Sequence, residues 1–69
     1  RGDQALGIKV QPTVSRGELT RLMEALAQGM AREFPGRTLA VNAYYQSGDK
    51  LAEAVYDPRT AHTDVRFAG

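Results

Sequence analysis

The sequence predicts an α+β fold in two layers, with the element order β-α-β-β-β and one amphipathic helix packed on one face of a four-stranded mixed sheet. Apolar residues recur at three- and four-residue steps in the middle of the chain, which is typical of a helix buried on one side. On either side of this segment apolar and polar residues alternate, as in half-buried strands. With 69 residues the chain can form one core, so we expect a single domain over residues 1–69, with residues 1–4 as a disordered terminus.

The first strand is predicted over residues 5–14, where Leu6, Ile8 and Val10 share one side. Pro12 has no backbone donor, so we expect regular pairing to weaken at that residue. The helical crossover to the second strand makes these two strands parallel and their connection right-handed. Two placements stay open, because the first strand can lie beside the second strand or the fourth with its apolar residues facing the helix in either case.

Two signals place the start of the helix at Ser15. The Ser15 oxygen can accept from the Glu18 amide while the Glu18 carboxylate accepts from the Ser15 amide, which is a capping box. Val14 and Leu19 stand at the positions of a hydrophobic staple. The helix should end before Pro35, since proline disfavours helical geometry at the preceding residue. The predicted buried stripe consists of Leu19, Leu22, Met23, Leu26, Met30 and Phe34.

Gly29 lies at the flank of this stripe, inside the predicted helix. A glycine there lowers stability by about 1 kcal/mol relative to alanine. Close approach of the sheet would explain it, and so would simple tolerance.

The three strands after the helix are predicted to form an antiparallel meander. The second strand covers residues 38–46, and Gly48 and Asp49 are the expected central residues of a two-residue turn. This turn places Tyr45 opposite Ala52 in the third strand.

A four-residue loop over residues 58–61 is predicted to connect the third and fourth strands. It turns Thr63, Val65 and Phe67 toward the helix, beneath Leu22. A loop one residue longer would instead point the charged side chains of the last strand into the core, which is unfavourable.

One helix can cover one face of this sheet, so the opposite face is predicted to stay open. On it Glu53 falls opposite Arg66 and Asp57 opposite His62, and both pairs carry charges that can meet across strands. The apolar members of this surface form a small exposed patch, and an ordinary solvated face fits the same pattern. The candidate interaction surface consists of Asn42, Tyr44, Leu51, Glu53, Val55, His62 and Arg66.

The composition limits the chemistry that this surface can carry. The chain has no cysteine and one histidine, so no catalytic residue, cofactor or metal site is predicted. Nine basic and eight acidic residues give a net charge of +1 without a block of like charge, which does not favour a nucleic-acid partner. The longest apolar run is too short for a membrane span, so we expect a soluble chain, and the sequence indicates no compartment.

The leading interpretation is a non-catalytic protein-interaction or assembly module cut from a longer protein, since the chain does not begin with methionine. Its expected partner is a protein, including a second copy of the chain, bound by the open face or by a free strand edge. One alternative is a single-stranded nucleic-acid-binding module in which Tyr44 stacks on a base and Lys9 and Arg66 contact the backbone. A second alternative is a small enzyme or enzyme fragment in which Asp57 orients His62 as a general base.

Overall fold

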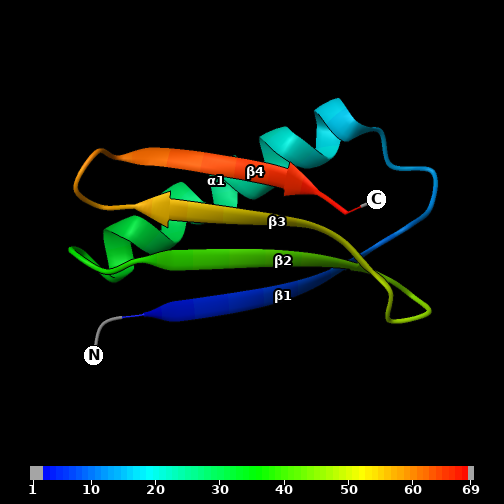
Figure 1. The fold of residues 1–69 in the computed structure, drawn as a ribbon, viewed down its shortest axis with the longest axis horizontal. Coiled ribbons are helices and arrows are strands. Elements are labelled where there is room, and N and C mark those ends of the chain that lie inside the picture. Colours follow the sequence, from blue (N-terminus) through cyan, green and yellow to red (C-terminus); the bar gives the residue numbers. More distant parts are fainter. Residues whose placement is uncertain (1–2, 69) are drawn as a thin grey trace.

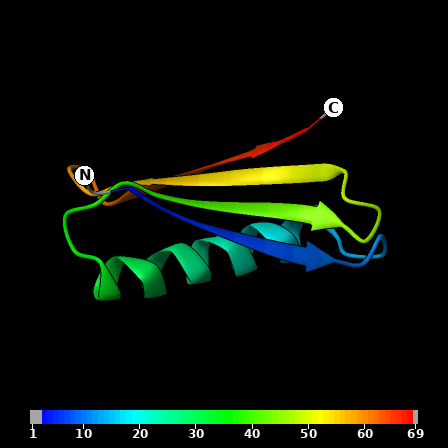
Figure 2. The same ribbon diagram turned by 90° about the horizontal axis from the view of Figure 1, so that it is seen from below.

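The computed structural model describes residues 3–68 and has the predicted two-layer α+β architecture (Figure 1). The elements are β1 (Gln4–Val10), α1 (Arg16–Glu33), β2 (Leu39–Tyr45), β3 (Lys50–Asp57) and β4 (His62–Phe67). The strands lie in the order β1-β2-β3-β4, with β1 parallel to β2 and the other neighbours antiparallel. Figure 2 shows the sheet as one layer and α1 as the other.

β1 pairs with β2, which decides between the two placements that the alternation leaves open. Leu6 lies opposite Val41 and Ile8 opposite Ala43, so the apolar side of β1 continues the buried side of β2. In Figure 1, β1 runs from left to right, α1 returns behind the sheet and β2 lies above β1, so the crossover is right-handed as expected. β1 and β4 are therefore the two outer strands of the sheet.

The first strand begins earlier than predicted. Gln4 is the first residue of β1, and its amide donates to the Thr38 carbonyl at 3.1 Å. The expected disordered terminus therefore does not extend to Gln4, and residues 1–2 lie outside the described part of the chain. The strand ends at Val10 rather than at the predicted Val14, because Pro12 has no backbone donor for regular pairing.

The capping box at the start of α1 is confirmed. Ser15 Oγ accepts from the Glu18 amide at 3.1 Å, and Glu18 Oε1 accepts from the Ser15 amide at 3.2 Å. These bonds satisfy amides of the first turn that have no partner within the helix. The helix ends at Glu33, where the Phe34 amide donates to the Met30 carbonyl at 2.8 Å, so both ends lie where the sequence predicts them.

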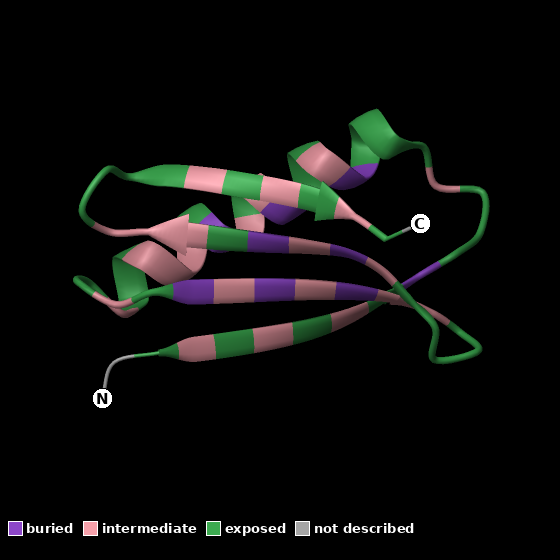
Figure 3. Cartoon of the chain, viewed as in Figure 1, coloured by how far each residue is buried: buried purple, intermediate pink, exposed green. Residues whose placement is uncertain are grey.

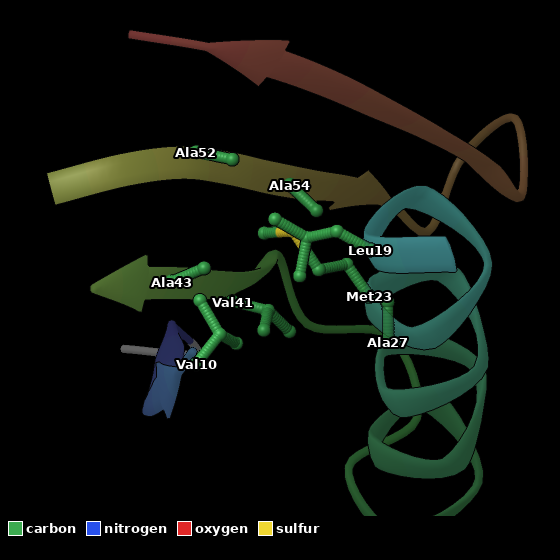
Figure 4. Packing of buried hydrophobic residues seen from close by; sticks show 8 residues of the cluster. All are labelled: Val10, Leu19, Met23, Ala27, Val41, Ala43, Ala52 and Ala54. Atoms are coloured by element: carbon green, nitrogen blue, oxygen red, sulfur yellow. The ribbon is translucent and has the colours of Figure 1, made fainter. Parts of the chain in front are cut away.

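The core lies between α1 and the inner side of the sheet (Figure 4). Leu19 and Met23 are the large, fully buried side chains of the helix, and much of what faces them on β2 and β3 is alanine. Because alanine is short, it leaves room for these longer side chains to pack closely. Figure 3 shows buried residues alternating with less buried ones along β2. The buried residues are Val10, Leu19, Met23, Ala27, Leu39, Val41, Ala43, Ala52 and Ala54.

The predicted helix stripe is wrong at Leu22, whose surface is 44% exposed. The fully buried row is Leu19, Met23 and Ala27, which recur every four residues, and Leu26 packs half-buried beside it. Ala27 has the shortest side chain of the row and is also buried. With this row packed against the sheet, Leu22 lies outside it and is exposed.

The turn between β2 and β3 is one residue longer than predicted. The Gly48 amide donates to the Tyr45 carbonyl and the Tyr45 amide to the Asp49 carbonyl, both at 2.9 Å. The loop therefore has three residues, and Gly48 closes it with a φ of 97°. As a result Ala43, rather than Tyr45, lies opposite Ala52. This shift of two residues leaves the same side chains facing the helix, because strand side chains alternate with a period of two.

The loop between β3 and β4 has the predicted four residues, 58–61. Thr63 lies opposite Tyr56 and Val65 opposite Ala54, as the choice of this loop requires. The half-buried side chains packed against the core include Tyr45, Tyr56, Val65 and Phe67, so the predicted alternation is confirmed at these four residues.

Gly29→Ala is expected to raise the free energy of unfolding by about 0.5–1 kcal/mol. Apart from its chain neighbours and the backbone of its own helix, a Cβ atom at Gly29 would meet no described atom within 4 Å, so close approach of the sheet does not explain this glycine. Urea denaturation followed by circular dichroism measures the change. Gly36→Ala is the control, because Gly36 has a φ of 80° and a side chain there should cost about 1 kcal/mol. Equal effects of the two substitutions would contradict this expectation.

Candidate functional site: the open face of the sheet

The open face of the sheet is the surface on the side opposite α1, toward the viewer in Figure 1. Alternation along each strand defines it, since the intervening residues pack toward the helix. All of the predicted surface residues except Leu51 lie together on this face. The open face consists of Ala5, Gly7, Lys9, Ala40, Asn42, Tyr44, Glu53, Val55, Asp57, His62, Asp64 and Arg66.

Leu51 is turned to the helix side by a β-bulge, so its predicted place on the open face is wrong. Ala43 lies opposite Ala52, but the next residue of β2, Tyr44, lies opposite Lys50. Leu51 is therefore the extra residue of β3 at the bulge. Its side chain packs half-buried against the core. The predicted apolar patch of Tyr44, Leu51 and Val55 thus loses Leu51.

A hollow of about 600 Å³ lies on the open face over β3 and β4. Val55, which is 37% exposed, supplies its apolar part, and charged groups of both signs surround it. His62 and Asp57, the pair on which the enzyme alternative depends, are cross-strand neighbours within it. Thr60 also contributes, from a loop where no periodic pattern could have indicated it. The lining residues are Glu53, Val55, Asp57, Thr60, His62, Asp64 and Arg66.

The predicted ion pair of Glu53 and Arg66 is replaced by two local pairs, although the two residues lie opposite each other as predicted. Arg66 Nε lies 3.0 Å from Asp64 Oδ2 on its own strand, and Lys50 Nζ lies 3.0 Å from Glu53 Oε1. These side chains are more than 40% exposed, so each pair contributes less than about 1 kcal/mol. These ion pairs therefore hold the charges of the open face only weakly.

Asp57 is engaged by the loop that follows it rather than by His62. Its Oδ1 atom accepts from the Arg59 amide at 2.9 Å and lies 3.5 Å from Arg59 Nε. The bond from the Arg59 amide holds the pKa of Asp57 below its ordinary value. The carboxylate thus stabilises the turn between β3 and β4, and the predicted pairing of Asp57 with His62 is wrong in this respect.

The chain is expected to lose stability in acid. The amides of Arg59 and Ser15 hold the pKa values of Asp57 and Glu18, respectively, below their ordinary values. The stabilisation is therefore complete above the ordinary carboxyl pKa of about 4 and is lost as the pH falls through the lower folded value. Urea midpoints measured from about pH 7 to about pH 2 should fall in the wild type and fall less in the double variant Asp57→Asn, Glu18→Gln. Equal slopes in the two proteins would show that other groups cause the loss.

Asn42 lies in the middle of the open face with an unsatisfied acceptor. Its Oδ1 atom is buried and accepts no hydrogen bond from the described residues. Gly7 and Glu53 are its neighbours on the adjacent strands. A Cβ atom at Gly7 would lie 3.6 Å from Tyr44 Cε1, so the Tyr44 ring extends over β1 beside Asn42. The sequence pattern places Asn42 on this face but does not reveal the buried acceptor, which depends on how neighbouring side chains lie.

Other features bear on the remaining hypotheses. Tyr45, Tyr56 and Phe67 pack toward α1, which leaves Tyr44 as the aromatic residue on the open face for stacking with a base. Within residues 3–68, no three His, Asp or Glu side chains converge in a way that could hold a metal ion. No helix in the described residues is both long enough and apolar enough to span a bilayer.

No protein-family model, curated protein or solved structure matches the chain.

Proposed function

We propose that the chain is a non-catalytic protein-interaction or assembly module that acts through the open face or a free edge of its sheet. The observation that carries this proposal is the one-sided covering of the sheet. α1 packs on one face, and within the described residues no element covers the other face or pairs with the outer edges of β1 and β4. Free edges and uncovered faces are the surfaces through which sheets add strands or partners.

The small size of the domain supports the same proposal. A core in a chain of 69 residues supplies only about 3–5 kcal/mol of stability without a disulfide or a metal. Association with a second copy would stabilise the folded state further, because the partner binds only the folded chain. Copies of the chain itself are therefore the partner tested first.

Sedimentation velocity over a range of chain concentrations tests self-association directly. We expect the average mass to rise above the 7.5 kDa of the monomer as the concentration increases. Leu22→Glu and Val55→Glu are a matched pair, since they change the two large apolar residues that are exposed within residues 3–68, and these lie on opposite sides of the molecule. Leu22→Glu should leave association unchanged, because it alters the helix side. Val55→Glu should weaken association only if the open face, rather than an edge, is used.

A mass of 7.5 kDa at every concentration up to the millimolar range would contradict self-assembly. Weakening by Leu22→Glu alone would contradict the use of the sheet, because it would place the contact on the helix.

A further inference from the structure

The outer edge of β4 presents a regular row of unpaired backbone groups. The Ala68 amide donates to the Leu51 carbonyl at 2.8 Å, and the pairing of β4 with β3 is unbroken from Phe67 back to His62. In an antiparallel ladder, residues alternate between bonding to the neighbouring strand and pointing away from it. The odd-numbered residues of β4, between Thr63 and Phe67, therefore direct their N–H and C=O groups away from β3, toward the free edge.

The edge of β4 is better suited to strand addition than the edge of β1. β4 contains no proline and its pairing with β3 has no bulge. In β1, the Gln4 amide donates to β2. The backbone groups of Ala5, Gly7 and Lys9 therefore point toward the free edge. Pro12 follows the strand. Glycine, an edge lysine and proline all disfavour pairing of a further strand.

The charges on β4 distinguish among the antiparallel pairings of two copies. Pairings that keep at least two outward residues of each β4 strand paired place the twofold axis at Asp64, at Val65 or at Arg66. An axis at Asp64 or at Arg66 would place that residue opposite the same residue of the other copy, so like charges would meet. An axis at Val65 places Asp64 of each copy opposite Arg66 of the other. In this register Val65 faces Val65 and Thr63 faces Phe67, and all of the outward residues of β4 form hydrogen-bonded pairs.

We propose that two copies of the chain pair through their β4 edges, antiparallel, about a twofold axis at Val65. This inference rests on the proposed function and names the surface that serves it. Each of the three outward residue pairs exchanges two backbone hydrogen bonds. The two four-stranded sheets become one continuous sheet, both helices lie on the same side of it, and the two open faces form one surface.

The diagonal course of α1 is compatible with this pairing (Figure 1). The helix begins beside the end of β4, where Arg16 Cζ lies 4.8 Å from the centre of the Phe67 ring, and it runs away toward β2. The start of β4 is thus left uncovered on the helix side. A twofold rotation about Val65 brings the first turn of the partner's helix toward this uncovered part, so the two helices lie at opposite ends of the new strand pair.

Charge reversal tests the register. Asp64→Arg and Arg66→Asp each turn two attractive cross-strand contacts into repulsive ones, so each should raise the dimer dissociation constant roughly tenfold or more in sedimentation equilibrium. The double variant carries both changes and should restore wild-type dissociation, because the opposite charges again face each other. Both side chains are exposed, by 53% and 83%, so the fold should tolerate the changes, and circular dichroism checks it.

Glu33→Arg is the matched control, since it makes the same change of charge as Asp64→Arg but lies at the exposed end of α1. It should leave the dissociation constant unchanged. Val65→Pro is a second test that does not depend on charge. The Val65 amide points away from β3, so proline there removes a hydrogen-bond donor to the second copy but breaks no hydrogen bond to β3. The variant should therefore be a folded monomer.

The outcomes separate the two proposals. A wild type that stays at 7.5 kDa at every concentration would overturn the β4 dimer and self-assembly together. If the wild type associates and either single charge-reversal variant associates equally well, the β4 dimer alone is overturned. The same holds if the double variant does not regain the dissociation constant of the wild type. In those cases the proposed function would stand and Val55→Glu would test the open face as the contact.

Discussion

Leu19→Ala is expected to leave the chain largely unfolded at room temperature. Leu19 is fully buried between α1 and the alanines of the sheet. Removing such a side chain from a core lowers the free energy of unfolding by about 2–5 kcal/mol, because the cavity it leaves closes only in part. A core of this size supplies about 3–5 kcal/mol in total. Far-UV circular dichroism and urea denaturation measure the loss.

Leu22→Ala is the matched control for this prediction. It makes the same chemical change one turn along the same helix, but Leu22 is 44% exposed. The loss should therefore be less than about 1 kcal/mol. Similar losses in the two variants would mean that Leu22 is buried in solution, either by a different rotation of the helix or by a second copy of the chain. Dilution distinguishes these, since only the second depends on concentration.

The features that sequence predicted well are those decided by neighbours along the chain. Ser15 and Glu18 satisfy each other within one turn, so the start of α1 needs no knowledge of the sheet. The loop between β3 and β4 could be chosen because the alternative would bury charge. Alternation in the last three strands follows from the same rule, and it correctly placed Tyr45 and Phe67 on the helix side.

The rotation of α1 and the register of the β2–β3 hairpin could not be derived in this way. Apolar spacing gives Leu22 as much weight as Leu19, and it does not show that the row of Leu19, Met23 and Ala27 is the one that packs on the sheet. A two-residue turn and a three-residue turn both require a glycine with positive φ, so Gly48 alone does not distinguish them.

The candidate site was also predicted only in part. The incorrect parts again depend on how the strands pair and how the side chains lie. The bulge that turns Leu51 away from the open face is part of the pairing of β2 with β3. The predicted two-residue turn gives a regular register for this pair, so it does not indicate the bulge. The positions of Glu53 and Arg66 are as predicted, but their ion-pair partners are not. Long exposed side chains choose among several charges at little cost, so strand register alone does not select their partners.

Asn42→Val is expected to raise the free energy of unfolding by about 1–2 kcal/mol. The Asn42 Oδ1 atom is buried without a hydrogen bond from the described residues, and an unsatisfied buried acceptor is unfavourable by about 1–3 kcal/mol. Valine has nearly the same size, is favoured in strands and brings no polar atom into the site. Urea denaturation at neutral pH measures the gain.

Asn42→Asp is the control, because it retains the shape of the side chain and places a negative charge beside Glu53 in a half-buried position. It should lower the free energy of unfolding, since a buried charge needs a partner. A loss of stability in Asn42→Val would show that the amide makes a stabilising contact. Sedimentation of Asn42→Val then separates the two surfaces. β3 lies between Asn42 and β4, so a dimer through the β4 edge should be unaffected, whereas weaker association would place the second copy on the open face.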